Sequence, residues 1–183
     1  MKDNYILLAT HADDELINMY GFIDRNPYVN QNSSVILITG GDLVRTDRFT
    51  DTMKALEKDC KVLPFYPDAL LSYDRKLVFN TLYEVIDKLA AKVGQTWIVI
   101  PSLFDTHPEH LLVSVIGLRI AAEQGFGCIS CTRTNNEKTI MEHTGKSLAI
   151  RYYYPEEYKN LTNNLYFTNG NDTETHSIIL KPK

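Results

Sequence analysis

The chain has 183 residues, of which 44% are hydrophobic and 23% charged, and this composition is typical of folded globular proteins. Its 19 basic and 23 acidic residues give a formal net charge of −4, which disfavours a nucleic-acid-binding protein because such proteins usually carry a basic surface. No run of about 18 apolar residues, the length that a membrane-spanning helix needs, is present. We therefore predict a single domain over residues 1–183, with no nucleic-acid partner and no membrane span.

Short apolar runs alternate with segments of helical periodicity along the chain. In chain order they predict strand 5–9, helix 16–23, strand 35–39, helix 49–60, strand 61–65, helix 78–89, strand 97–100, helix 111–122, strand 126–131 and a last strand near 177–180. The helix at 111–122 is apolar nearly all round, so we expect it to be central. The alternation predicts an α/β fold: a single Rossmann-like domain with a mostly parallel sheet and helices on both faces.

The cysteines and the N-terminus indicate a reduced compartment. Cys60, Cys128 and Cys131 cannot all pair within one chain, and the Cys128-x-x-Cys131 spacing lacks the second pair that a zinc knuckle needs. We interpret Cys128 and Cys131 as buried strand residues, because a free cysteine behaves as a small hydrophobic side chain. The apolar run at 5–9 is too short for the core of a signal peptide. These features predict a cytoplasmic protein.

Two loops that follow predicted strands are rich in histidine and carboxylate. In open α/β sheets ligands bind at the carboxyl ends of the strands, which is where both loops lie. The first runs from Thr10 to Glu15 and the second from Pro101 to His110. Together they hold three of the five histidines and five carboxylates, namely His11, Asp13, Asp14, Glu15, Asp105, His107, Glu109 and His110.

Each loop alone could simply be the start of a helix. Thr10 could be an N-cap with the three acidic residues after it favoured by the helix dipole. Asp105 or Thr106 could cap a second helix, with Pro108 near its first position. This helix-start interpretation does not explain the histidines, because the N-terminus of a helix disfavours a cationic imidazole.

The alternative is a metal site. A His-x-x-Asp spacing at a strand–helix turn, completed by a histidine from a neighbouring loop, gives two nitrogens and one carboxylate oxygen. This donor set suits catalytic zinc with an open position, and a 2-His-1-carboxylate set also suits Fe²⁺. We favour zinc, because Asp13 and the remaining histidine would then serve hydrolysis as base and acid.

Three segments together resemble a known enzyme family. His11-Ala12-Asp13-Asp14-Glu15 resembles the His-Pro-Asp-Asp-Glu signature of the LmbE/PIG-L-like zinc-dependent N-deacetylases, and Asp105-Thr106-His107-Pro108-Glu109-His110 resembles their Asp-x-His-Pro-Asp-His signature. Thr39-Gly40-Gly41-Asp42, followed by Arg48-x-x-Asp51-x-x-x-Ala55, is similar to the family's Thr-x-Gly turn and Arg-x-x-Glu-x-x-x-Ala helix. The match is in order and covers roughly the first 130 residues.

The resemblance implies a Rossmann-like enzyme that hydrolyses an acetamide, commonly on an N-acetylglucosamine conjugate, so the expected partner is a small molecule. It implies that His11, Asp14 and His110 are the zinc ligands and that Asp13 is the general base. His107 would stabilise the oxyanion and protonate the departing amine, and Arg48 would contact the substrate.

Three positions depart from the family pattern. Ala12 replaces a proline. Glu109 replaces an aspartate, and we expect the residue at this position to orient other side chains rather than to bind the metal. Asp51 replaces a glutamate and so shortens the reach of an expected support for the first loop.

Two alternatives to a sugar deacetylase stay open. The same machinery could act on a non-sugar or nucleotide-linked amide, or the fold could be a non-catalytic small-molecule binding module. The presence of both Asp13 and His107 disfavours the module, because simple binding needs neither a base nor an acid.

Overall fold

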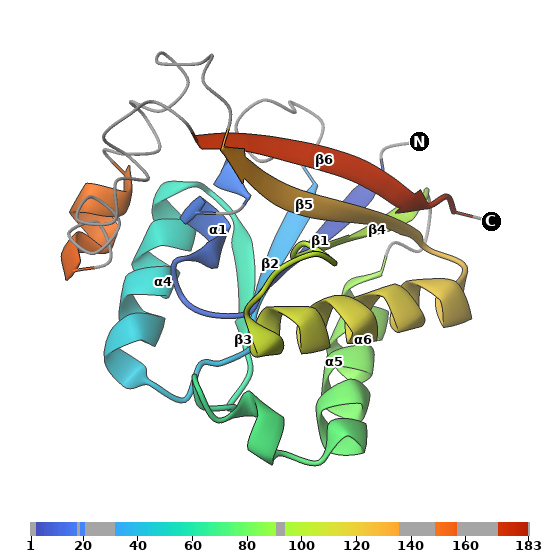
Figure 1. Cartoon of the computed structure of the whole chain (residues 1–183), viewed down its shortest axis with the longest axis horizontal. Coiled ribbons are helices and arrows are strands. Elements are labelled where there is room, and N and C mark those ends of the chain that lie inside the picture. Colours follow the sequence, from blue (N-terminus) through green and yellow to red (C-terminus); the bar gives the residue numbers. More distant parts are fainter. Residues whose placement is uncertain are drawn as a thin grey trace.

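In the computed structural model, which describes residues 3–17, 19–20, 32–90, 94–135, 149–156 and 172–182, a six-stranded sheet lies at the centre (Figure 1). Its strand order is β3-β2-β1-β4-β5-β6, and all neighbours are parallel except β5 and β6. The strands are β1 (Asn4–Ala9), β2 (Ser33–Leu37), β3 (Asp59–Val62), β4 (Thr96–Ile100), β5 (Gly127–Asn135) and β6 (Asp172–Leu180).

Apolar residues along the central strands alternate between two cores, one on each face of the sheet. In β1, Ile6 and Leu8 belong to one core, whereas Leu7 and Ala9 belong to the other, and all four are fully buried. Successive side chains of a strand point to opposite faces, so a strand covered on both faces has a continuous apolar sequence. For this reason the strands could be predicted from unbroken apolar runs in the sequence.

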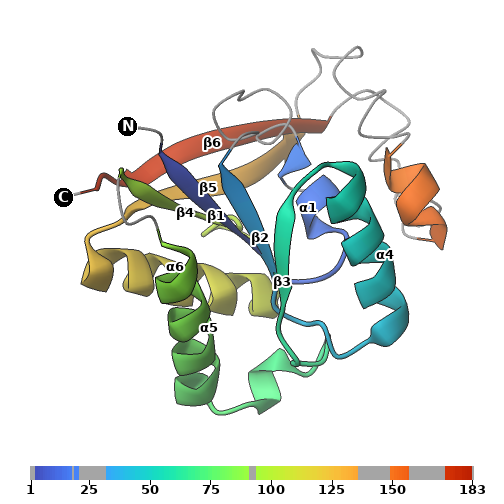
Figure 2. The same ribbon diagram turned by 180° about the vertical axis from the view of Figure 1, so that it is seen from behind.

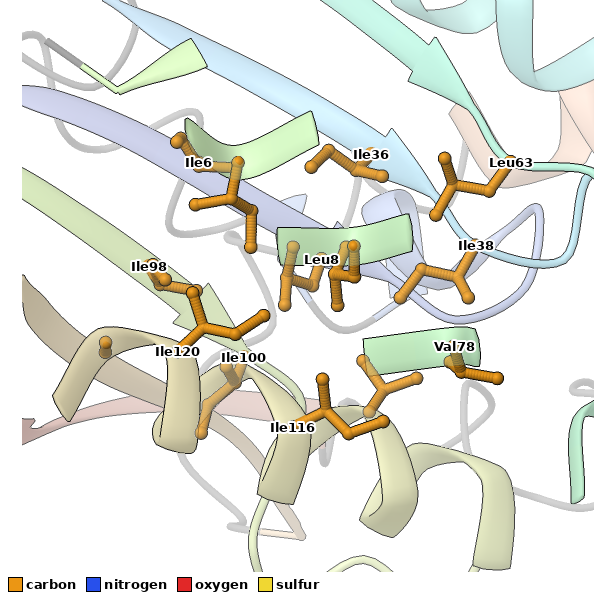
Figure 3. Packing of buried hydrophobic residues seen from close by; sticks show 14 of the residues in the cluster. Ile6, Leu8, Ile36, Ile38, Leu63, Val78, Ile98, Ile100, Ile116 and Ile120 are labelled. Carbon is orange, nitrogen blue, oxygen red and sulfur yellow. The ribbon is translucent and has the colours of Figure 1, made fainter. Parts of the chain in front are cut away.

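Two long helices cover the first face (Figure 3). They are α5 (Arg75–Leu89) and α6 (Pro108–Gln124), and the short 3-10 helix η1 (Leu70–Ser72) precedes α5. Val78 of α5 and Ile116 and Ile120 of α6 pack against strand residues such as Leu8 and Ile100. Gly117 of α6 lies so close to the sheet that a Cβ there would come within 2.6 Å of Ile100.

The second face is covered by α1 (Asp14–Ile17), α4 (Leu43–Ala55) and a helical segment at 149–156, which both views place beside α4 (Figures 1 and 2). Phe49 and Met53 of α4 pack with Leu16 of α1 and with Ile150 and Tyr154 of the segment. The predicted fold class is therefore confirmed: a Rossmann-like α/β arrangement with helices on both faces.

Several predicted boundaries were wrong. Cys60 was expected on the helix that begins near residue 49, but α4 ends at Ala55 and Cys60 lies in β3. Glu57, with a positive φ of 54°, turns the chain between the two. The strand expected at 61–65 lies at 59–62 instead, because Pro64 has no N–H to donate to a ladder and forms only an isolated bridge with Thr39.

Two further helix predictions differ from the structure. The helix expected at 16–23 corresponds to α1, which begins at Asp14 and ends at Ile17. Residues 21–23 lie outside the described part of the chain. The helix expected to be central, α6, covers one face of the sheet, and its residues Leu111 and Val115 are exposed. Within the described ranges, no helix is both long and apolar enough to span a membrane.

Candidate metal centre

The first and fourth strands are neighbours in the sheet, so the loops that follow them lie side by side. β1 pairs with β2 on one side and with β4 on the other, and the chain order of the strands reverses at β1 and β4. This reversal is a topological switch point, where open α/β sheets leave a crevice at their carboxyl edge. The two histidine-rich loops meet at this point.

Three donor atoms from these loops form a compact triangle. His11 Nδ1 lies 3.1 Å from His110 Nε2, and Asp14 Oδ2 lies 3.3 Å from His110 Nε2 and 3.7 Å from His11 Nδ1. Ligands bound tetrahedrally to zinc at about 2.0–2.1 Å are separated from one another by roughly 3.3 Å. The structure thus brings together two nitrogens and one carboxylate oxygen at separations that fit a single zinc-sized ion.

The backbone of the first loop contributes to this geometry. Asp14 Oδ2 accepts a hydrogen bond from the His11 backbone N–H at 2.8 Å, so the two side chains are fixed relative to each other within one turn. Both residues are buried, at 9% and 3% exposure. Removing water from such groups is costly unless they are paired or bind a metal.

A second carboxylate orients the ring of His11 from behind. Glu109 Oε2 lies 2.7 Å from His11 Nε2. Its carboxylate also accepts hydrogen bonds from the backbone N–H groups of Leu70, at 2.6 Å, and Asp68, at 3.2 Å. Because a carboxylate accepts, the His11 proton belongs on Nε2, and this leaves the lone pair of Nδ1 directed at the triangle. Glu109 therefore contacts a histidine as an orienting residue, as its position in the motif suggested.

His110 has the corresponding arrangement with Asp105. Its Nδ1 lies 2.8 Å from Asp105 Oδ2, while Asp105 Oδ1 accepts a hydrogen bond from the His107 backbone N–H at 2.8 Å. Each of the two histidines thus presents one nitrogen to the triangle and the other to a carboxylate. This carboxylate–histidine pattern is typical of metal-binding histidines.

The charges of the cluster reinforce one another. Burial disfavours the charged form of His110, but Asp14 and Asp105 outweigh this effect and raise its pKa to about 10. Burial likewise opposes ionisation of Asp14, yet the adjacent His110 and His11 hold the pKa of this carboxyl below its ordinary value. The acidic and basic groups of the cluster thus favour each other's charged forms.

The third histidine lies against the other two. The His107 ring centroid is 5.0 Å from that of His11 and 4.7 Å from that of His110, and donor atoms of all three lie within 4.8 Å of one another. His107 Nδ1 accepts the Glu109 backbone N–H at 3.3 Å, so His107, and not Asp105 or Thr106, is the N-cap of α6. Burial and the two neighbouring histidines lower the pKa of His107.

Asp13 has an unusual backbone conformation at the start of α1. Its φ is 138°, a region that residues other than glycine rarely adopt and that costs of order 1–3 kcal/mol. Its carbonyl accepts the N–H groups of Leu16 and Ile17, so the helix begins after Asp13, and Thr10 is not its N-cap. The Asp13 N–H donates to Glu15 Oε2 at 3.0 Å.

Glu15 is fully buried and bonded to a distant residue that the sequence did not single out for this site. Its Oε1 accepts a hydrogen bond from the Tyr154 hydroxyl at 2.5 Å. Burial raises the pKa of Glu15 to about 7, and burial together with Glu15 raises the pKa of Tyr154. No sequence signal indicates this contact, because Tyr154 follows two other tyrosines and matches no motif.

The third element of the motif set builds a neighbouring turn. Asp42 caps α4 by accepting from the N–H groups of Val44 and Arg45, at 3.0 and 3.2 Å. Arg48, the expected substrate contact, is half-buried on α4. Asp51, expected to support the first loop, is exposed, and the carboxylate from outside this loop that contacts it is that of Glu109, on His11.

Solved structures with a similar fold include deacetylases and a hydratase. A deacetylase of the teicoplanin biosynthetic pathway, a triple mutant, is 12% identical with a TM-score of 0.70, covering 96% of this chain and 97% of that chain. The N,N'-diacetylchitobiose deacetylase from Pyrococcus horikoshii is 14% identical with a TM-score of 0.68, covering 96% and 84%. The 4-carboxy-2-hydroxymuconate hydratase from Pseudomonas putida KT2440 is 13% identical with a TM-score of 0.65, covering 100% and 98%.

Comparison with family models and with curated proteins gives no match. At these identities the structural likeness concerns the fold alone. A shared fold supports a reaction only through the residues of the site.

Proposed function

We propose that the protein is a zinc-dependent N-deacetylase of the LmbE/PIG-L-like type, which releases acetate from an N-acetylated amino sugar or its conjugate. The observation that carries the proposal is the triangle formed by His11, Asp14 and His110, with a carboxylate on the far nitrogen of each histidine. Simple helix starts need no such arrangement, whereas a metal centre does.

Two independent lines support deacetylation as the reaction. The motifs at 11–15 and 105–110 resemble those of the deacetylase family, and the fold resembles those of deacetylases acting in teicoplanin biosynthesis and on diacetylchitobiose. Because the name of one neighbour specifies N,N'-diacetylchitobiose, an N-acetylated amino-sugar compound, an N-acetylated sugar conjugate is the substrate class that we propose first.

His11, Asp14 and His110 would hold the metal ion. When bound, zinc supplies Lewis acidity toward a carbonyl oxygen and an adjacent water. We propose zinc rather than Fe²⁺ because the neighbouring Asp13 and His107 suit hydrolysis. The teicoplanin deacetylase is also described in a zinc-inhibited form, so the test below measures metal content and activity together.

The other residues of the two loops have separate roles in this proposal. Asp13 accepts the proton of the attacking water, since it follows His11 by two residues on the strained turn and is not part of the donor triangle. His107 stabilises the oxyanion and delivers a proton to the departing amine. Arg48 binds the substrate from α4.

Metal content and acetate release test the proposal together. The protein is stripped with a chelator and reloaded with zinc, and acetate is then measured with N-acetylglucosamine conjugates, N-acetylated sugar nucleotides and diacetylchitobiose. We expect one zinc per chain, and loss of both zinc and activity in His11→Ala and His110→Ala. Glu123→Gln, an exposed change on α6, is the control and should match the unmodified protein.

Two outcomes would overturn the proposal or its role assignments. A folded protein that binds no divalent metal would contradict the proposal that this chain is a metal-dependent enzyme. Asp13→Asn should keep zinc and lower kcat by about 10²- to 10⁴-fold. If it lost zinc as His11→Ala does, Asp13 would be a ligand and not the base.

The hydratase neighbour defines the main competing reaction. Zinc binding without acetate release from any of these compounds would favour addition of water to a double bond, or hydrolysis of a non-acetyl amide, by the same residues. Bound zinc with no turnover of any amide or alkene would favour a binding module.

A further inference from the structure

The main chain of Asp13 is held in an unfavourable conformation by contacts on both sides of the residue. With φ at 138°, a non-glycine residue stays in this region only when its surroundings fix it there. The carbonyl side of the residue is fixed by the first turn of α1, through the N–H groups of Leu16 and Ile17 at 3.0 and 2.8 Å. The amide side is fixed by Glu15 Oε2, at 3.0 Å.

The contact from Glu15 resembles the return half of a capping box, in which a glutamate near the helix start accepts the N–H of the capping residue. Here the glutamate is fully buried and therefore removed from bulk solvent. A buried carboxyl group needs hydrogen-bonding partners to keep a defined position. Its other oxygen, Oε1, is held by the hydroxyl of Tyr154 at 2.5 Å.

Tyr154 is itself held by backbone and side-chain contacts. It is fully buried, and its backbone N–H donates to the Ile150 carbonyl at 2.7 Å. Its side chain lies in the same apolar cluster as Leu16 of α1 and Met53 of α4. Figures 1 and 2 show the segment at 149–156 on the outer side of this layer, next to α4. The chain of contacts Tyr154–Glu15–Asp13 therefore connects the first loop to a segment 139 residues later.

The triangle of donor atoms is supported by different residues. His11 is oriented by Glu109 and His110 by Asp105, and neither of these carboxylates contacts Tyr154 in the hydrogen bonds described. Loss of the Tyr154 hydroxyl should consequently leave the metal ligands in place and release the turn at Asp13.

We propose that Tyr154 is a positioning residue for the deacetylation proposed above: acting through Glu15, it fixes the backbone of Asp13 and thereby the direction of the general base. The inference rests on the proposed function, in which Asp13 is the base. Its structural half, that Tyr154 fixes the Asp13 turn, holds whatever the substrate is.

Tyr154→Phe removes only the hydroxyl and is the test. We expect one zinc per chain, an unchanged KM and a kcat lowered by about 10- to 100-fold, since a small misplacement of a catalytic group has effects of this size. Tyr153→Phe, on the neighbouring half-buried tyrosine, is the matched control and should behave as the unmodified protein. Ile150→Val, which weakens the same packing without touching the hydroxyl, should lower the melting temperature by about 2–4 °C and leave kcat unchanged.

A double-variant cycle tests whether the effect passes through Glu15. Glu15→Gln and Tyr154→Phe together should lower kcat little more than Glu15→Gln alone, because both remove the same link. If Tyr154→Phe does not fold, Glu15→Gln alone replaces it, with the same expected loss in kcat. Losses that multiply, an unchanged kcat, or a fall in zinc content that accounts for the lost activity would each overturn the proposal.

Amide hydrogen exchange separates this proposal from the proposed function. Exchange in a peptide spanning residues 11–17 should be faster in Tyr154→Phe than in the unmodified protein or in Tyr153→Phe, because the Asp13 N–H loses a fixed acceptor. If acetate release fails for every substrate but this exchange increases, the deacetylase assignment is wrong and the positioning role stands. Unchanged exchange overturns the role itself.

Discussion

Replacing Glu109 by glutamine tests whether a carboxylate behind His11 sets the affinity of the site for metal. In the structure Glu109 uses one oxygen for His11 Nε2, at 2.7 Å, and the other for the Leu70 N–H, at 2.6 Å. Glutamine has nearly the same volume but only one acceptor oxygen. Its NH₂ group would then face either the His11 N–H or the Leu70 N–H, two donors in contact.

The size of both effects follows from these contacts. Loss of the carboxylate behind a metal-binding histidine lowers metal affinity by about 10- to 100-fold, or about 1.4–2.8 kcal/mol. Leaving one buried donor without an acceptor lowers the free energy of unfolding of the metal-free protein by about 1–3 kcal/mol. For a chain of this length, about 2 kcal/mol corresponds to a melting temperature lower by about 4–8 °C.

Two measurements give these values separately. Zinc affinity is measured by competition with a chromophoric chelator, and stability is measured by thermal unfolding in excess chelator. Glu123→Gln is the matched control, because Glu123 lies on the same helix but pairs with Arg119 on the surface, with 44% and 66% of the side chains exposed. Such an exposed pair contributes about 0.3–0.5 kcal/mol, so the control should change neither zinc affinity nor, beyond about 1–2 °C, the melting temperature.

Either of two results would refute the reasoning. An unchanged zinc affinity in Glu109→Gln would mean that the orientation of His11 does not depend on this carboxylate. A loss far above 100-fold would mean that Glu109 is itself a ligand, in the alternative donor group formed by His11, Asp68 and Glu109.

Three further predictions concern the scaffold. Gly117→Ala should lower the free energy of unfolding by about 1–3 kcal/mol in urea titrations, because the Cβ of the alanine would meet Ile100 at 2.6 Å and Leu8 at 2.8 Å. An unchanged urea midpoint would contradict this close packing. Burial raises the pKa of the Cys128 thiol to about 12, above the unfolded value of 9.0, so the stabilisation by the neutral thiol is complete below pH 9 and is lost as the pH rises. The stability advantage over Cys128→Ala should therefore shrink by about 1.4 kcal/mol per pH unit above about pH 9. A difference in stability that stays constant with pH would contradict the raised pKa. Asp74→Ala should lower stability by about 1 kcal/mol, since Asp74 caps α5 through two backbone N–H groups, whereas Asp74→Asn should be nearly neutral.

The sequence was sufficient for the sheet and for the two loops because both depend on local patterns. Strands buried on both faces are unbroken apolar runs, and the rule that ligands bind at their carboxyl ends directs attention to residues 10–15 and 101–110. Which strands are neighbours is not a local property. The pairing of β1 with β4, which brings His11 to His110, is known only from the structure.

The supporting contacts were not predictable for the same reason. Glu109 was expected to orient, but its partners Leu70 and Asp68 lie 39 and 41 residues away in the chain and contribute backbone groups, which leave no mark in a sequence. Tyr154 lies 139 residues along the chain from Glu15, its partner in the first loop. The boundary at Cys60 failed because apolar spacing of four, three and four continued past the point where Glu57 turns the chain.

Burial in the first loop disfavours the interpretation of its acidic run as a helix start alone. If Asp13, Asp14 and Glu15 served only the dipole of a helix start, they would be solvated, and the four residues of α1 would give them little dipole to interact with. Instead Asp14 is 3% exposed and Glu15 is fully buried, although carboxylates are rarely buried unless paired. Each has a separate direction: Asp14 toward two histidines, and Glu15 toward Tyr154 and the Asp13 N–H. A helix start explains neither direction, whereas both fit the proposed metal centre with the proposed base beside it.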